Sequence, residues 1–71
     1  QDRVQALKLA EKAYELKPDA RITDTLAEAS FLNDQIQRAI DLEIEAIKKD
    51  TQYLKEYRER LAKYKKALTA Q

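Results

Sequence analysis

The sequence predicts an all-α protein of four short helices packed as antiparallel hairpins. Its 71 residues include no glycine and one proline, and Ala, Leu, Glu, Lys, Arg and Gln dominate, which is a helix-forming composition. Apolar residues recur at the three- and four-residue spacing of amphipathic helices. The breaks between these segments are short, and short connections favour antiparallel neighbours.

Proline and helix-capping residues divide the chain into segments. The first helix is expected from about Asp2 to Lys17, because Pro18 cannot donate to the hydrogen-bond ladder of a helix. The second is expected from about Arg21 to Asn33.

The third helix is expected after Asp34. The Asp34 carboxylate would cap its exposed amides, and Gln37 would reach back as in a capping box. This helix would end near Asp50 and Thr51, either of which can cap a fourth helix over about residues 52–70.

The apolar faces of these helices differ in width. On the first, Leu9 and Leu16 lie on the far side from Leu7 and Tyr14, so this helix needs neighbours on two sides. The fourth has a single apolar seam, which comprises Leu54, Tyr57, Leu61, Tyr64 and Leu68. A one-sided helix is typical of the capping end of a helical stack, and a two-sided helix of its interior.

The small residues of the second and third helices carry a resemblance to a known family. Leu26 followed by Ala27, and then Ala39 and Ala46, resemble one complete tetratricopeptide repeat (TPR). That family repeats at about 34 residues, and here Ala39 lies 33 residues after Ala6. The same interval of 33 residues separates Ala46 from Ala13.

The resemblance divides the single domain 1–71 into three parts. Residues 1–18 resemble the second helix of a preceding half repeat, 20–50 a full repeat, and 51–71 a capping helix. It therefore implies an antiparallel α-hairpin array, a fragment of a TPR-like α-solenoid.

The family pattern is not met at four positions, which are Ser30, Asp34, Glu43 and Thr51. Asp34 stands at the usual turn glycine, and Glu43 at a large apolar position. Glu43 lies beside the isoleucine stripe of the third helix, where a carboxylate is costly unless it is paired or hydrogen-bonded. Its expected partners are Arg58 and the hydroxyl of Tyr57 or Tyr64.

The composition argues against an enzyme. Cys and His are both absent, which removes the best protein nucleophile and the commonest general base. The one serine, Ser30, lies mid-helix among apolar neighbours, where a small packing residue is expected. Asp24 and Glu28 are one turn apart, which is typical of helix surface rather than of a metal site. We therefore expect no catalytic residues, no metal and no cofactor.

The charge pattern also argues against nucleic acids and membranes as partners. The net charge is +1, which argues against a nucleic-acid binder. Residues 51–71 carry six Lys or Arg against two acidic residues, but these cations are scattered around the helix, so neither a membrane nor RNA is the expected partner. No apolar run is long enough to span a bilayer, and no signal-peptide pattern opens the chain. The lack of cysteine fits the cytoplasm and is neutral about the periplasm.

Two surfaces are candidate binding sites. Arg21, Asp24, Glu28 and Phe31 share one face of the second helix. The TPR resemblance implies that this face lines a concave groove, where an aromatic and two carboxylates suit a partly basic, partly apolar protein or peptide segment. The alternative is a solvated face with Phe31 turned inward.

The second surface is the outer side of the first helix. Val4, Leu9 and Leu16, with Ala13, are expected to stay uncovered in a monomer and to mediate homo-oligomerisation.

These observations predict a protein–protein interaction scaffold, the C-terminal portion of a TPR array. The missing initiator Met suggests a piece of a longer protein. Two alternatives stay open at this stage. One is a self-associating structural module without a peptide ligand. The other is an engineered repeat, because a chain without Gly, Met, Trp, Cys and His is unusual.

Overall fold

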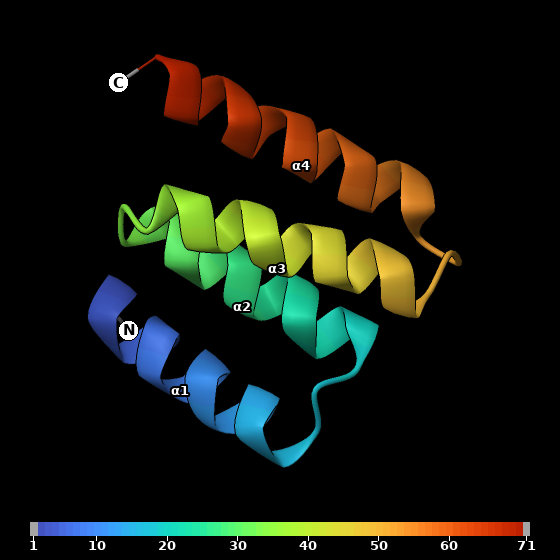
Figure 1. Cartoon of the computed structure of the whole chain (residues 1–71). Helices are drawn as coiled ribbons and strands as arrows, with labels where there is room; N and C mark the ends of the chain where they lie inside the picture. Colours follow the sequence, from blue (N-terminus) through green and yellow to red (C-terminus); the bar gives the residue numbers. More distant parts are fainter. Residues whose placement is uncertain (1, 71) are drawn as a thin grey trace.

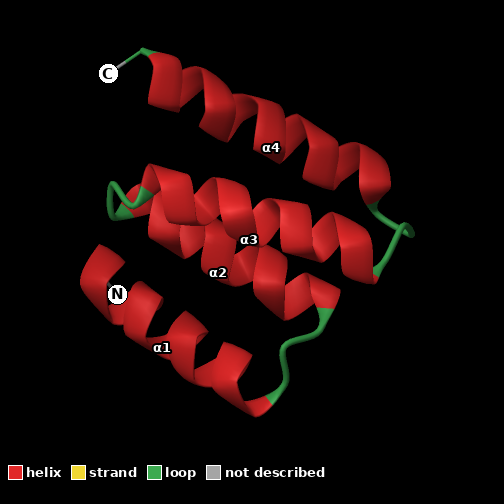
Figure 2. Ribbon diagram, viewed as in Figure 1, coloured by secondary structure: helices red, strands yellow, loops and turns green. Residues whose placement is uncertain are grey.

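The computed structural model describes residues 2–70 and contains four α-helices and, over that range, no strand. They are α1 (Arg3–Leu16), α2 (Ala20–Leu32), α3 (Ile36–Lys49) and α4 (Leu54–Thr69) (Figures 1 and 2). The predicted all-α, four-helix class is confirmed, with each helix boundary within about two residues of the expected position.

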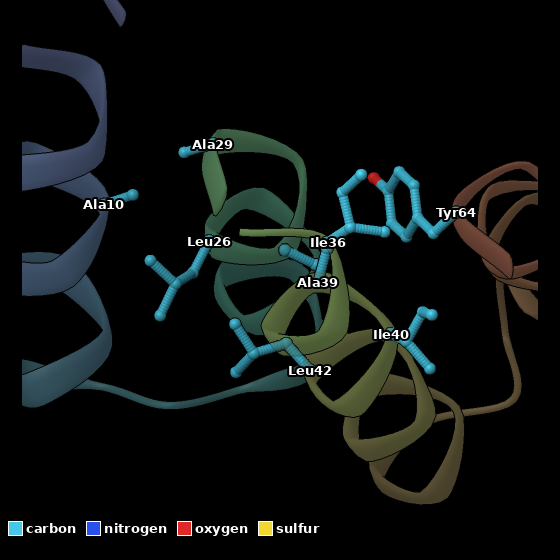
Figure 3. Packing of buried hydrophobic residues seen from close by; sticks show 9 residues of the cluster. Ala10, Leu26, Ala29, Ile36, Ala39, Ile40, Leu42 and Tyr64 are labelled. Atoms are coloured by element: carbon cyan, nitrogen blue, oxygen red, sulfur yellow. The ribbon is translucent and has the colours of Figure 1, made fainter. Parts of the chain in front are cut away.

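Consecutive helices run antiparallel, and the α2/α3 hairpin lies in the middle (Figure 1). Seen from close by, α1 lies on one side of this hairpin and α4 on the other (Figure 3). α1 packs mainly on α2, and α4 mainly on α3. The molecule is flat, with extents of 29 × 29 × 16 Å.

Aspartates cap the first two helices. An Asp2 side-chain oxygen accepts from the Gln5 amide at 2.7 Å, and an Asp19 oxygen accepts from the Ile22 amide at 2.8 Å. α1 ends at Leu16, two residues before Pro18, as the sequence predicts. These caps satisfy amides that the helix itself leaves free.

The predicted capping box at the start of α3 is wrong. The N-cap is Gln35, which makes no side-chain cap bond. The side-chain amide of Gln37 instead donates to the Asp41 carboxylate at 3.1 Å. Asp34 has a φ of 62°, and its amide donates to the Phe31 carbonyl at 3.1 Å. Asp34 therefore forms the left-handed turn that closes α2, the role that glycine usually fills, and is not free to cap the next helix.

The start of α4 also differs from its prediction. Tyr53 is the N-cap and makes no side-chain cap bond. An Asp50 side-chain oxygen accepts from the Gln52 amide at 2.9 Å, and the Thr51 carbonyl accepts from the Leu54 amide at 3.2 Å. Asp50 and Thr51 therefore stabilise the turn before the helix, and the helix begins two residues later than expected.

Small residues fill the contact between α2 and α3. Ala27 and Ser30 of α2, and Ala39 and Ala46 of α3, are all fully buried. Larger residues pack around them to form the core, which includes Leu26, Ile36, Ile40 and Leu42 (Figure 3). Small side chains permit the close approach of two helices, and large neighbours fill the space around it.

Two tyrosines are the most buried residues of the predicted α4 seam. Tyr57 and Tyr64 are each 1% exposed, whereas Leu54 and Leu61 are half-buried. The last seam residue, Leu68, is exposed. The seam is thus buried as predicted over its first three turns, and it is open at the C-terminal end.

Replacing Asp34 with glycine is expected to stabilise the chain. The left-handed backbone costs a residue with a Cβ more than it costs glycine, so Asp34→Gly should raise the free energy of unfolding by about 0.5–1 kcal/mol. Thermal unfolding followed by circular dichroism measures this. The control Asp41→Gly, at an exposed site inside α3, should instead lower the melting temperature. An Asp34→Gly variant less stable than the parent would contradict the role assigned to this turn.

Candidate protein-binding surfaces

α4 covers much of the predicted groove on α2. An Asp24 carboxylate oxygen, Oδ2, accepts from Nη1 of Arg60 in α4 at 2.8 Å. Phe31 is half-buried and stacks on Tyr64 of α4, with 4.7 Å between ring centroids and 29° between ring planes. The Lys63 ammonium lies 5.2 Å from the Phe31 centroid. Two of the four predicted groove residues are therefore engaged within the chain.

The other two groove residues are exposed. Glu28 has an exposed side chain, and the Arg21 guanidinium lies 4.7 Å from the centroid of the Tyr53 ring. A hollow of about 90 Å³ lies between α2 and α4, with room for a few water molecules. Its lining residues are Arg21, Asp24, Tyr53, Glu56, Tyr57 and Arg60. This surface is a mixture of both charges, and ligand binding in the groove stays a prediction.

The predicted self-association residues are all exposed, but they do not share one face. Val4 is 55% exposed, Leu9 51% and Leu16 79%. At about 100° per residue, Leu9 and Leu16 point within about 20° of each other, whereas Val4 is about 140° from Leu9. Ala13, half-buried, lies next to the two leucines. We call Leu9, Ala13 and Leu16 the Leu9–Leu16 stripe.

Polar bonds hold the opposite side of α1. The Arg38 guanidinium donates two bonds to the Glu11 carboxylate, each of 2.6 Å, and this bonding lowers the pKa of Glu11. The Tyr14 hydroxyl donates to Glu45 at 2.7 Å. The pKa of Glu45 is lowered, first by its bond from Lys49 and then by that from Tyr14. With α1 fixed in this way, the Leu9–Leu16 stripe faces away from the rest of the chain.

Glu43 is the most unusual residue between the helices. Its side chain is 0% exposed, and neither carboxylate oxygen has a hydrogen-bond donor among the described residues. Burial is the largest cause that raises its pKa, the neighbouring Asp24 raises it further, and Arg60 opposes the shift. Together these effects raise the pKa of Glu43 to about 9. Burial therefore favours the neutral form of the Glu43 carboxyl.

The expected partners of Glu43 are wrong. A charged residue of α4 is present, but it is Arg60, and Arg58 is exposed to solvent. No hydrogen bond joins Glu43 to Tyr57 or Tyr64. Arg58 and Arg60 flank the α4 seam on opposite sides, and the sequence did not reveal which flank faces α2. Asp24, placed in the groove by the sequence analysis, is the neighbour that was missed.

Comparisons with known proteins assign no family. No protein-family model matches this sequence, and no curated protein or solved structure is significantly similar to it. The TPR resemblance therefore depends on the residues and spacing alone. Over residues 2–70 no helix has the length and apolarity needed to cross a membrane. The same part of the chain has no group of three or more potential metal ligands.

Arg58 and Arg60 of α4 provide a matched test of the ion pair between Asp24 and Arg60. Arg60→Met should lower the free energy of unfolding by about 1–2 kcal/mol, because it leaves the buried Asp24 carboxylate without its cation. Arg58→Met should change it by less than about 0.5 kcal/mol. Urea unfolding of both variants measures the difference. Equal losses would show that Asp24 does not depend on Arg60.

Proposed function

We propose that this chain is a non-enzymatic helical scaffold that binds protein through the Leu9–Leu16 stripe of α1. The observation that carries the proposal is the exposure of Leu9 and Leu16 at 51% and 79%. An exposed apolar patch on a small protein is a typical protein-binding site, because covering it removes apolar surface from water.

The predicted groove on α2 is the competing binding surface, and it is less open to a ligand than the Leu9–Leu16 stripe. There α4 already contacts Asp24 and Phe31, so the aromatic that would anchor a ligand is half-covered. The Leu9–Leu16 stripe has no such cover, and α1 is anchored through its other side. Binding at the stripe therefore needs no rearrangement of the described helices.

The partner that fits the stripe is another α-helix, and a second copy of the chain supplies one. Leu9 and Leu16 are seven residues apart, the spacing at which residues of one helix meet those of a neighbour along a seam. In an antiparallel pair related by a two-fold axis, Leu9 of one copy would lie against Leu16 of the other. Lys12 flanks the middle of the stripe, so the two Lys12 side chains would come close and repel each other.

The TPR resemblance extends the proposal without being needed for it. In a TPR array the outer side of such a helix packs on a neighbouring helix of the array. The same stripe could then serve as an array contact in a longer chain. A cytoplasmic location, consistent with the lack of cysteine, is part of the proposal.

Sedimentation equilibrium over a wide concentration range tests the proposal. The parent should self-associate, and raising the salt concentration should strengthen the association, because salt screens the Lys12 repulsion. Leu9→Lys/Leu16→Lys should be monomeric at every concentration.

The matched control is Val4→Lys, on the same helix but on another face. It should associate as the parent does. A strictly monomeric parent, or equal loss of association in Val4→Lys, would contradict the role of the stripe. Circular dichroism of each variant ensures that a change in association does not reflect unfolding.

A further inference from the structure

Three buried carboxylate oxygens between the helices have no hydrogen-bond partner in the part of the chain that the structure describes. They are Oδ1 of Asp24 and both carboxyl oxygens of Glu43. The remaining Asp24 oxygen, Oδ2, accepts from Arg60 at 2.8 Å. The two carboxyl groups are neighbours, since Asp24 is among the groups that raise the pKa of Glu43. A buried acceptor with no donor is costly, so this cluster requires a donor.

One proton supplies that donor. Two adjacent buried carboxylates repel each other strongly, and the pair avoids this by keeping a single proton. Asp24 has Arg60 to compensate its negative charge, whereas the completely buried Glu43 has no cation bonded to it. The proton therefore belongs on Glu43, whose O–H would donate to Oδ1 of Asp24.

Among the described residues, no donor from the surrounding elements lies within hydrogen-bond distance of these three oxygens, and the buried Tyr57 hydroxyl is itself without a partner. α2 contributes a second carboxylate, Glu28, and α4 contributes Arg60 and the phenols of Tyr57 and Tyr64. On the α1 side of the hairpin, Arg38 of α3 is already bonded to Glu11 of α1. Within residues 2–70, Arg60 is thus the cation that acts on Glu43, and it is bonded to Asp24.

We propose that Asp24 and Glu43 share one proton, and that this proton holds α4 on the α2/α3 hairpin. The chain of contacts runs from Glu43 of α3 to Asp24 of α2 and on to Arg60 of α4. Tyr57 and Tyr64 of α4 cover the cluster, each 1% exposed. When Glu43 loses the proton, an unpaired negative charge is buried beneath these rings, and α4 must move away to let water reach it.

The dependence of stability on pH follows from the difference in the Glu43 pKa between the folded and the unfolded chain. The Glu43 pKa is about 9 in the folded chain and 4.5 when the carboxyl is unperturbed. The folded chain binds the proton in this range and the unfolded chain does not, so stability falls as pH rises. The full contribution of the shared proton is present below about pH 4.5, and it is lost as pH rises to about 9.

A carboxyl titration tests the position of the proton directly. In the ¹³C NMR spectrum of a Glu-labelled chain, the Glu43 carboxyl carbon should titrate above pH 7, well above the ordinary range of a glutamate. A Glu43 midpoint below pH 6 would overturn the proposal. This experiment uses the unaltered chain, so it does not depend on whether a variant folds.

Unfolding constants of variants, measured as a function of pH, test whether the Glu43 proton stabilises the fold. Glu43→Gln replaces the acid with a neutral amide that can also donate to Asp24. The unfolding constant of the parent, divided by that of Glu43→Gln, should rise about tenfold per pH unit between pH 5 and 8. Glu59→Gln, at an exposed site on α4, should keep the pH dependence of the parent. A pH-independent ratio for Glu43→Gln would contradict the shared proton.

The movement of α4 needs its own readout. Nuclear Overhauser contacts between the Phe31 and Tyr64 rings report α4 docking, and contacts between α1 and α2 serve as an internal control. As the pH rises through the titration midpoint of Glu43, the Phe31–Tyr64 contacts should weaken, while the contacts between α1 and α2 persist. If both sets persist after Glu43 ionises, the proton is shared but does not hold α4.

Discussion

The close contact between α2 and α3 is the constraint on which the other parts of this structure depend. Ala27 and Ser30 of α2, and Ala39 and Ala46 of α3, are all fully buried. The Ser30 hydroxyl donates to the Leu26 carbonyl at 2.8 Å, so this polar group enters the contact without an unmet hydrogen bond. The contact makes the hairpin thin, and both of its sides are therefore available for packing.

The two sides of the hairpin are used differently. On one side, α4 inserts Tyr57 and Tyr64 against α3 and buries Glu43 beneath them. On the other, α1 contributes one buried residue, Ala10, together with the partly buried Leu7 and Tyr14 and polar pairs such as Glu11–Arg38. A helix held mainly along one side keeps its opposite side free, which explains why the Leu9–Leu16 stripe is exposed. The shared proton and the proposed interaction surface are thus located on opposite sides of the hairpin.

The helices could be predicted from the sequence because local signals fix them. Pro18 and the three- and four-residue apolar spacing depend only on neighbouring residues, and so does the seam of α4. The start of α3 could not be predicted, because Asp34 suits both a cap and a left-handed turn. Only the route of the chain between α2 and α3 decides between these two roles.

The candidate surfaces depended on longer-range packing and were predicted less completely. Exposure of Leu9 and Leu16 was expected from the width of the apolar surface of α1, and simple helix geometry separates Val4 from them. The cluster of Asp24, Glu43 and Arg60 joins three helices. The sequence marks Glu43 as unusual because it lies beside the isoleucine stripe, but Asp24 and Arg60 have the pattern of ordinary surface charges. Only the relative position of the helices reveals that the three residues meet.

Amide hydrogen exchange followed by NMR tests the central role of the α2/α3 contact most directly. Helices that are packed on both sides open only with the whole chain, whereas flanking helices can open separately. The account predicts the slowest exchange in α2 and α3, near Ala27 and Ala39, with faster exchange in α1 and α4. Slower exchange in α1 or α4 than in α2 and α3 would contradict the claim that this contact organises the structure.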